Sequence, residues 1–146
     1  MFNSVLVVCV GNICRSPLGE RLLRQALPEL EVTSAGINAL VGKPAAKTAS
    51  QVAAAHGLSL HGHRARQFSS EIGTAHDLIL VMEPGHKREV ARIAQHLAGR
   101  VMLFDKWTGD RGIADPYLKP HKFHEKTYQA ISEAAQAWAV RLAPKE

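Results

Sequence analysis

Three runs of consecutive apolar residues restrict the folds open to this chain more than any other feature. They are Val5-Leu6-Val7-Val8-Cys9, Leu78-Ile79-Leu80-Val81-Met82 and Val101-Met102-Leu103-Phe104. None of them alternates with polar residues, as a strand with one face in water does. Strands with both faces buried show this pattern, so we expect a parallel sheet covered by helices. Glu31 to Ser34, followed by Ala35-Gly36, is a weaker fourth strand.

Helical segments separate these strands. Ser16-Pro17 starts the first, because serine is a common cap and proline suits the first helical position, and Pro28 ends it. Gly57 is a C-terminal cap for the second helix. The four predicted helices cover about 16–27, about 45–56, a segment with Val90, Ile93, Ala94 and Leu97 that ends near Gly99, and a segment from Tyr128 to Leu142. The alternation of strand and helix predicts an α/β domain with right-handed crossovers.

Length and composition narrow the class of protein. The chain has 146 residues, which fits one domain over residues 1–146. The apolar run from Val5 to Val10 is too short to span a membrane and no basic stretch precedes it, so we expect a cytoplasmic protein without membrane insertion. Two cysteines are too few for a disulfide scaffold or a four-thiolate metal site. The net charge of +5 favours anionic partners in general.

Two longer stretches, 37–44 and 106–122, lack strong periodicity and follow predicted strands. Ligands of parallel-sheet proteins bind beyond the carboxyl ends of the strands. These loops are therefore the expected walls of a binding site.

The segment between the first strand and the first helix is the most informative stretch of the chain. It reads Cys9-Val10-Gly11-Asn12-Ile13-Cys14-Arg15-Ser16-Pro17 and matches neither the Walker A nor the dinucleotide-binding pattern. A short loop that ends at a helix N-terminus directs several backbone N–H groups at one point and so binds an anion. Gly11 and Asn12 both tolerate the backbone angles of a tight curl.

The side chains of this loop suit phosphoryl transfer. Arg15 has a planar guanidinium that matches two phosphate oxygens. A cysteine beside an arginine and a helix N-terminus is expected to be largely thiolate, so Cys9 is the predicted nucleophile for attack on phosphorus. Ser16 can donate its hydroxyl to that thiolate and make it a better leaving group in the second step.

Cleavage of a phosphate ester also requires a proton for the leaving oxygen. Asp115-Pro116-Tyr117 lies in the long loop after the last strand. Proline biases the preceding residue to an extended conformation and stiffens the loop. Asp115 is therefore the predicted general acid, and the base for the attacking water.

The loop from Cys9 to Pro17 and the Asp115-Pro116-Tyr117 segment together resemble the low-molecular-weight protein-tyrosine phosphatases. Thr33-Ser34-Ala35-Gly36, His63-Arg64-Ala65-Arg66-Gln67 and the closing helix with Tyr128 also match, so the resemblance covers nearly the whole chain. The nearest match is the bacterial subgroup paired with tyrosine autokinases of capsule and exopolysaccharide production. The resemblance implies a flavodoxin-like, three-layer fold with a four-stranded parallel sheet flanked by helices.

The resemblance also implies roles for individual residues. Cys9, Arg15 and Asp115 would be catalytic, and Ser16 would activate the thiolate. Asn12 would hold the strained loop through hydrogen bonds, supported by Ser34 and His63. Phosphate would be bound by the loop residues Val10, Gly11, Asn12, Ile13, Cys14, Arg15 and Ser16. Cys14 would trap an oxidised Cys9 as a disulfide.

One departure from the family concerns the substrate pocket. Many eukaryotic members have a tryptophan or tyrosine where this chain has Leu40. Tyr117 would then supply the aromatic wall for a phosphotyrosine ring, with Leu40 as an aliphatic face. The implied partner is a phosphotyrosine protein, the C-terminal tail of a tyrosine autokinase. The enzyme is expected to be a monomer that binds no nucleic acid.

Other functions on this fold stay open from the sequence. An arsenate reductase coupled to thioredoxin needs further cysteines that the chain lacks. A protein-arginine phosphatase carries threonine where this chain has Ile13, and a non-enzymatic flavodoxin-like anion binder needs no thiolate. His61, His63, His121 and His124 form pairs that no carboxylate or cysteine completes, so we expect no metal and no cofactor.

Overall fold

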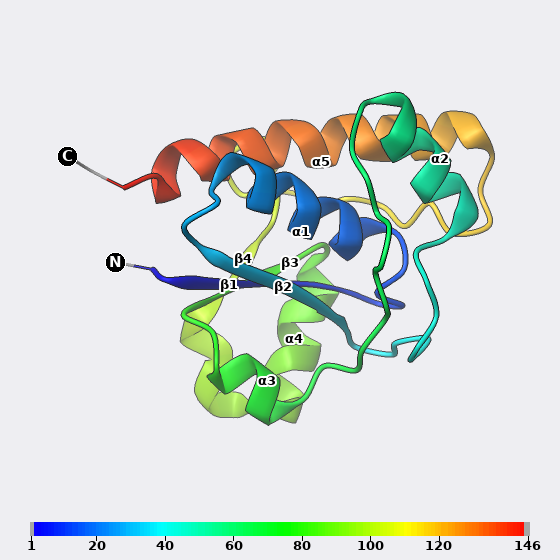
Figure 1. Cartoon of the computed structure of the whole chain (residues 1–146). Coiled ribbons are helices and arrows are strands. Elements are labelled where there is room, and N and C mark those ends of the chain that lie inside the picture. The colour runs from blue at the N-terminus through cyan, green and yellow to red at the C-terminus, as the bar shows by residue number, and fades with distance from the viewer. Residues whose placement is uncertain (1, 145–146) are drawn as a thin grey trace.

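The computed structural model describes residues 2–144 and has a four-stranded sheet at its centre (Figure 1). Its strands are β1 (Ser4–Cys9), β2 (Glu31–Gly36), β3 (Leu78–Val81) and β4 (Val101–Leu103). They run parallel in the order β2-β1-β3-β4. All four predicted strands are therefore confirmed, and so is the parallel sheet. The predicted single domain includes residues 1, 145 and 146, which lie outside the described residues, and it stays a prediction.

Helices cover both faces of the sheet in three layers, as Figure 1 shows. The helices α1, α2 and α5 lie on one face, and α3 and α4 lie on the other. Their bounds are α1 (Arg15–Ala26), α2 (Lys47–Ala55), α3 (Ser70–Thr74), α4 (Pro84–Ile93) and α5 (His121–Leu142), with a 3₁₀ helix, η1 (Gln95–Arg100), after α4. Within residues 2–144, none of these helices is long and apolar enough to cross a membrane.

The apolar run of β1 shows why this sheet is buried on both sides. Val5 and Val7 pack in one cluster with residues of α1, α2 and α5, whereas Leu6 and Val8 pack in a second cluster with residues of α4. Successive side chains of a strand point to opposite faces, so a continuous apolar run fills two cores at once.

The first helix starts differently from the prediction. It begins at Arg15, so Ser16 is its second residue and not its cap, and the capping position is Cys14, which makes no side-chain capping bond. The Ser16 hydroxyl contacts the side chains of Cys9 and Asn12 instead of a backbone N–H of the helix. The serine that the sequence suggests as a helix cap thus lies in the first turn of α1 and uses its hydroxyl to contact residues of the loop.

Two further differences lie on the other face of the sheet. The predicted third helix is broken at Ala94, whose φ of −147° and ψ of 82° are not helical, so η1 follows α4 as a separate element. The short helix α3 was not predicted, because its five residues are too few to show a helical period. Ser69 caps α3 by accepting a hydrogen bond from the backbone N–H of Ile72.

Candidate active site

The loop between β1 and α1 curls tightly beside the end of β2. Asn12 has a φ of 59°, which few residues other than glycine adopt without strain. Backbone bonds fasten the curl to the following loop, since Ile37 N donates to Cys9 O and Leu40 N donates to Gly11 O. A Cβ on Gly36 would lie 2.4 Å from the carbonyl oxygen of Val10, so this close approach requires glycine.

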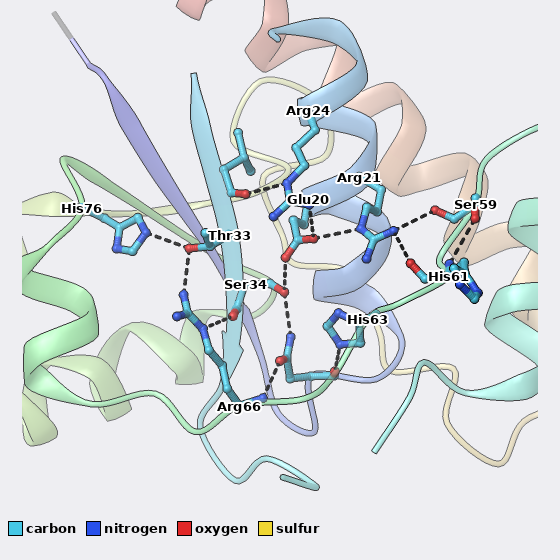
Figure 2. Close-up of polar contacts among 12 residues, drawn as sticks. Glu20, Arg21, Arg24, Thr33, Ser34, Ser59, His61, His63, Arg66 and His76 are labelled. Atoms are coloured by element: carbon cyan, nitrogen blue, oxygen red, sulfur yellow. Dashed lines mark hydrogen bonds and ion pairs between the residues drawn. The ribbon is translucent and has the colours of Figure 1, made fainter. Parts of the chain in front are cut away.

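Hydrogen bonds to Asn12 hold the curl, and Figure 2 shows three of the residues that make them, Ser34, His63 and Arg66. Its Nδ2 donates to Ser16 Oγ at 2.7 Å and to Ser34 Oγ at 3.0 Å, while its Oδ1 accepts from Arg66 N at 2.9 Å. His63 Nε2 donates to the Asn12 carbonyl at 2.6 Å. Burial lowers the pKa of His63, which favours the neutral ring. The structure thus brings together Asn12, Ser34 and His63, which the resemblance implied as the support of the loop.

The two cysteines of the loop have different surroundings. Cys9 is buried, and its Sγ lies 2.9 Å from Ser16 Oγ and 3.4 Å from Ser16 N. Both contacts are suited to a negatively charged sulfur. The pKa of Cys14 is raised to about 12, and burial is the largest cause. The nearby Cys9 and Asp115 also raise this pKa, whereas Arg15 lowers it. Cys14 is therefore a neutral thiol at physiological pH.

Arg15 is the largest fully buried side chain of the described residues and is 1% exposed. Its Nη1 donates to Glu83 Oε2 at 2.5 Å and to the carbonyl oxygen of Ile113 at 2.7 Å. Its Nε and Nη2 are buried and have no hydrogen-bond partner among residues 2–144. Unpaired buried donors are costly, so this edge of the guanidinium is shaped for an anionic ligand.

Asp115 stands at the mouth of the same site. Its Oδ2 is 3.6 Å from Arg15 Nη2, and its Oδ1 accepts a hydrogen bond from Tyr117 N at 3.0 Å. This turn fixes the carboxylate next to the tyrosine. The Asp115 side chain is 44% exposed, so it can meet both a substrate and water.

These residues enclose a pocket of about 200 Å³. The predicted wall residues Leu40 and Tyr117 line it, from the loops that follow β2 and β4. Asn12 and Ser16 do not line it and are buried behind the loop. The lining residues are Cys9, Val10, Gly11, Ile13, Cys14, Arg15, Asn38, Leu40, Asp115 and Tyr117.

The sequence assigned no role to three residues that contact the site. Glu83 pairs with Arg15, Arg66 donates to Asn12 through its backbone, and Glu20 accepts a hydrogen bond from Ser34. Glu83 and Glu20 lie in no recognised motif, and Arg66 lies in the stretch from His63 to Gln67 that matches the family but was given no role of its own. Trp107, whose position the sequence leaves undecided, packs against Trp138 and is not among the residues that line the pocket. No group of three or more histidine, cysteine, aspartate and glutamate residues within 2–144 is arranged to hold a metal ion.

Comparison with known proteins places this geometry in a family. Residues 4–146 match the family of low molecular weight phosphotyrosine protein phosphatases. The chain belongs to this family.

Relatives and solved structures that cover nearly the whole chain support the same assignment. It is 50% identical over 141 residues to the low molecular weight protein-tyrosine-phosphatase Etp of Escherichia coli K12, covering 97% of this chain and 95% of Etp. Its structure matches tyrosine phosphatase Wzb from E. coli K30, in complex with sulphate, with a TM-score of 0.97, 45% identity and coverage of 98% and 100%. Vibrio vulnificus Wzb, in complex with benzylphosphonate, gives a TM-score of 0.95 at 46% identity, with coverage of 97% and 100%.

The predicted fold and activity are therefore confirmed. The chain is a protein-tyrosine phosphatase with a four-stranded parallel sheet flanked by helices. The readings as an arginine phosphatase or as a non-enzymatic anion binder are not favoured, because relatives of about 50% identity are named protein-tyrosine-phosphatases.

Proposed function

We propose that the phosphatase hydrolyses phosphotyrosine through a cysteinyl-phosphate intermediate on Cys9. The observation that carries the proposal is the unpartnered edge of Arg15, which lines the same pocket as Cys9. A phosphate seated on Nε and Nη2 of this arginine would satisfy two buried donors. The Cys9 sulfur would then lie beneath the phosphorus for in-line attack.

The remaining residues divide the work of the two steps. Asp115 protonates the leaving phenol oxygen and then takes a proton from the attacking water. Ser16 donates to the Cys9 sulfur and stabilises the thiolate as it leaves the phosphoenzyme. Arg15 and the backbone N–H groups of the loop stabilise the charge that develops on the transferred phosphoryl group.

The pocket fits an aryl phosphate on a polypeptide. Leu40 and Tyr117 are 44% and 45% exposed, so they offer apolar surface to a phosphotyrosine ring without enclosing it. Ile13 also lines this pocket and adds an apolar side chain to it. A flat ring suits these walls better than the polar, charged guanidinium of phosphoarginine does.

We further propose that the partner is the phosphorylated C-terminal tail of a tyrosine autokinase in exopolysaccharide production. The likeness to Wzb and to the relative AmsI of Erwinia amylovora, at 50% identity, supports a phosphotyrosine protein as the partner. The net charge of +5 is suited to an anionic phosphorylated tail.

The test compares one tail peptide from an autokinase of the same genome, phosphorylated on tyrosine, with phosphoserine and phosphoarginine peptides. We expect rapid phosphate release from the phosphotyrosine peptide and little from the others. Cys9→Ser should release none, and Ile13→Thr should raise the rate on phosphoarginine relative to phosphotyrosine. Equal rates on all three parent reactions, or an active Cys9→Ser variant, would contradict the proposal.

A further inference from the structure

Glu20 is a buried carboxylate that does not line the catalytic pocket. It lies on α1, is 5% exposed and is surrounded by polar side chains, as Figure 2 shows. Its Oε1 accepts a hydrogen bond from Ser34 Oγ at 2.7 Å. Its Oε2 lies 3.0 Å from Arg21 Nε and 3.4 Å from Arg24 Nη1. A carboxylate is costly to bury, so the position of the Glu20 carboxylate among three polar partners calls for an explanation.

The hydrogen bonds from Glu20 to the reactive sulfur form one continuous chain. Glu20 contacts Ser34, Ser34 contacts Asn12, Asn12 contacts Ser16, and Ser16 contacts Cys9, at 2.7, 3.0, 2.7 and 2.9 Å. All five residues are 5% exposed or less. Water therefore offers few alternative partners to any of these groups.

Counting donors fixes the direction of this chain. A carboxylate only accepts, so the single hydroxyl hydrogen of Ser34 points to Glu20. Ser34 Oγ must then accept from the Asn12 amide, and Arg66 N holds the same amide in that orientation through Oδ1. The second amide hydrogen of Asn12 points to Ser16 Oγ.

Ser16 is the last member of the chain. Because its oxygen accepts from Asn12, its one hydrogen is left for the Cys9 sulfur. We propose that Glu20 is a positioning residue for phosphotyrosine hydrolysis, because its carboxylate turns the Ser34 hydroxyl so that Ser34 Oγ holds the Asn12 amide, from which Ser16 accepts while it donates to the Cys9 thiolate. The inference rests on the proposed role of Cys9 as nucleophile.

The two arginines explain why the charged form of the side chain matters. Arg21 Nε and Arg24 Nη1 both need an acceptor at the Oε2 position. In Glu20→Gln, the amide oxygen would serve them and the amide nitrogen would face Ser34 as a donor. The hydroxyl hydrogen of Ser34 would then lose its acceptor and compete with the Asn12 amide. The substitution keeps shape and volume but leaves Ser34 Oγ between two N–H donors, which weakens its hold on the Asn12 amide.

The first measurement is the pH dependence of Cys9 alkylation by iodoacetamide, with the site of modification read by mass spectrometry. In Glu20→Gln we expect the midpoint to rise by about one pH unit and kcat on phosphotyrosine to fall about tenfold, the size of effect of weakening one hydrogen bond to a charged group. KM should change much less. Alkylation reports on the sulfur without requiring turnover, so a failed nucleophile assignment shows separately, as an active Cys9→Ser variant.

The second measurement asks whether Glu20 acts through the chain. In a Ser16→Ala or Ser34→Ala background, Glu20→Gln should shift the alkylation midpoint no further, because the link to Cys9 is already broken. Thr33→Val is the matched control. It removes a hydroxyl from the neighbouring position of β2 that contacts Arg66 and His76 but is not a member of the chain, so the midpoint and kcat should stay at parent values.

Three results would overturn the inference. The first is a parent-like alkylation midpoint in Glu20→Gln, and the second is an equal shift in the Ser16→Ala background. The third is a parent-like alkylation midpoint in Ser34→Ala. This variant breaks the same link but leaves the Glu20 carboxylate with Arg21 and Arg24, so it also tests the inference if Glu20→Gln does not fold.

Discussion

Glu83 holds one end of the Arg15 guanidinium and leaves its other edge open. Its Oε2 lies 2.5 Å from Arg15 Nη1, which also donates to the Ile113 carbonyl. The pair crosses from the first residue of α1 to the capping position of α4, 68 residues along the chain. A buried arginine with five donors can turn in several ways, and these two acceptors select the orientation in which Nε and Nη2 meet a phosphate.

Removal of the Glu83 carboxylate should therefore weaken phosphate binding. We expect Glu83→Ala to lose about tenfold in kcat/KM on an aryl phosphate and to bind inorganic phosphate more weakly as an inhibitor. Glu89→Ala is the control, because Glu89 lies on the same helix and pairs only with the exposed Arg92. A phosphate inhibition constant in Glu83→Ala equal to that of the parent would mean that Ile113 and the loop suffice to orient Arg15.

The role proposed for Asp115 can be read from the leaving group. Tyrosine has a pKa near 10 and needs a proton, whereas a nitrophenolate needs it much less. Asp115→Ala should lose on the order of 10²–10⁴-fold in kcat on phosphotyrosine and clearly less on an activated aryl phosphate. The measurement is kcat across aryl phosphates of graded leaving-group pKa, with Cys9→Ser inactive on all. Parallel plots for parent and Asp115→Ala would show that another group delivers the proton.

The two cysteines should respond differently to peroxide. Burial and neighbouring charge raise the pKa of Cys14 to about 12, so Cys14 stays a thiol, and we expect peroxide to react first with Cys9, the proposed nucleophile. A sulfenic acid on Cys9 would then condense with Cys14 to a disulfide. We expect a dithiol reductant to restore the parent enzyme after peroxide, whereas Cys14→Ser should lose activity largely irreversibly. Full recovery of Cys14→Ser would remove the protective role.

Much of the fold follows from short-range patterns. The apolar runs of β1, β3 and β4 predict buried parallel strands because each fills a core on both faces of the sheet. The helix start at Ser16 was wrong for a reason of tertiary structure: the Ser16 hydroxyl contacts Asn12 and Cys9, which only the folded loop brings near.

Some residues of the site could likewise be predicted from the sequence, and others could not. Cys9, Arg15 and Asp115 lie in motifs whose spacing and chemistry are visible in the sequence. Glu83 contacts Arg15 across 68 positions and Glu20 contacts Ser34 across 14, and neither glutamate lies in a motif that marks it. Pairing of this kind depends on where α4 and α1 lie against the sheet, so it requires the structure.

Three buried histidines should make the enzyme less stable in mild acid. Burial is the largest cause that lowers the pKa of each of His63, His86 and His124 below the ordinary value. The unfolded chain, with a histidine pKa near 6.5, then binds protons more readily than the folded chain does. Their contribution to stability is complete above that pH, starts to fall as the pH drops through about 6.5, and is lost below each folded-state pKa.

Urea unfolding at about pH 7.5 and about pH 5 tests this expectation, because most carboxylates remain ionised over that interval. We expect a lower midpoint at the lower pH for the parent. His86→Gln should reduce the difference, since His86 Nδ1 is buried with no partner among the described residues and its Nε2 lies 3.6 Å from Glu83 Oε2, beyond hydrogen-bond distance. His61→Gln, at an exposed position, should leave the difference unchanged. A midpoint that does not move between the two pH values would mean that these histidines take up protons in the folded state as easily as in the unfolded chain.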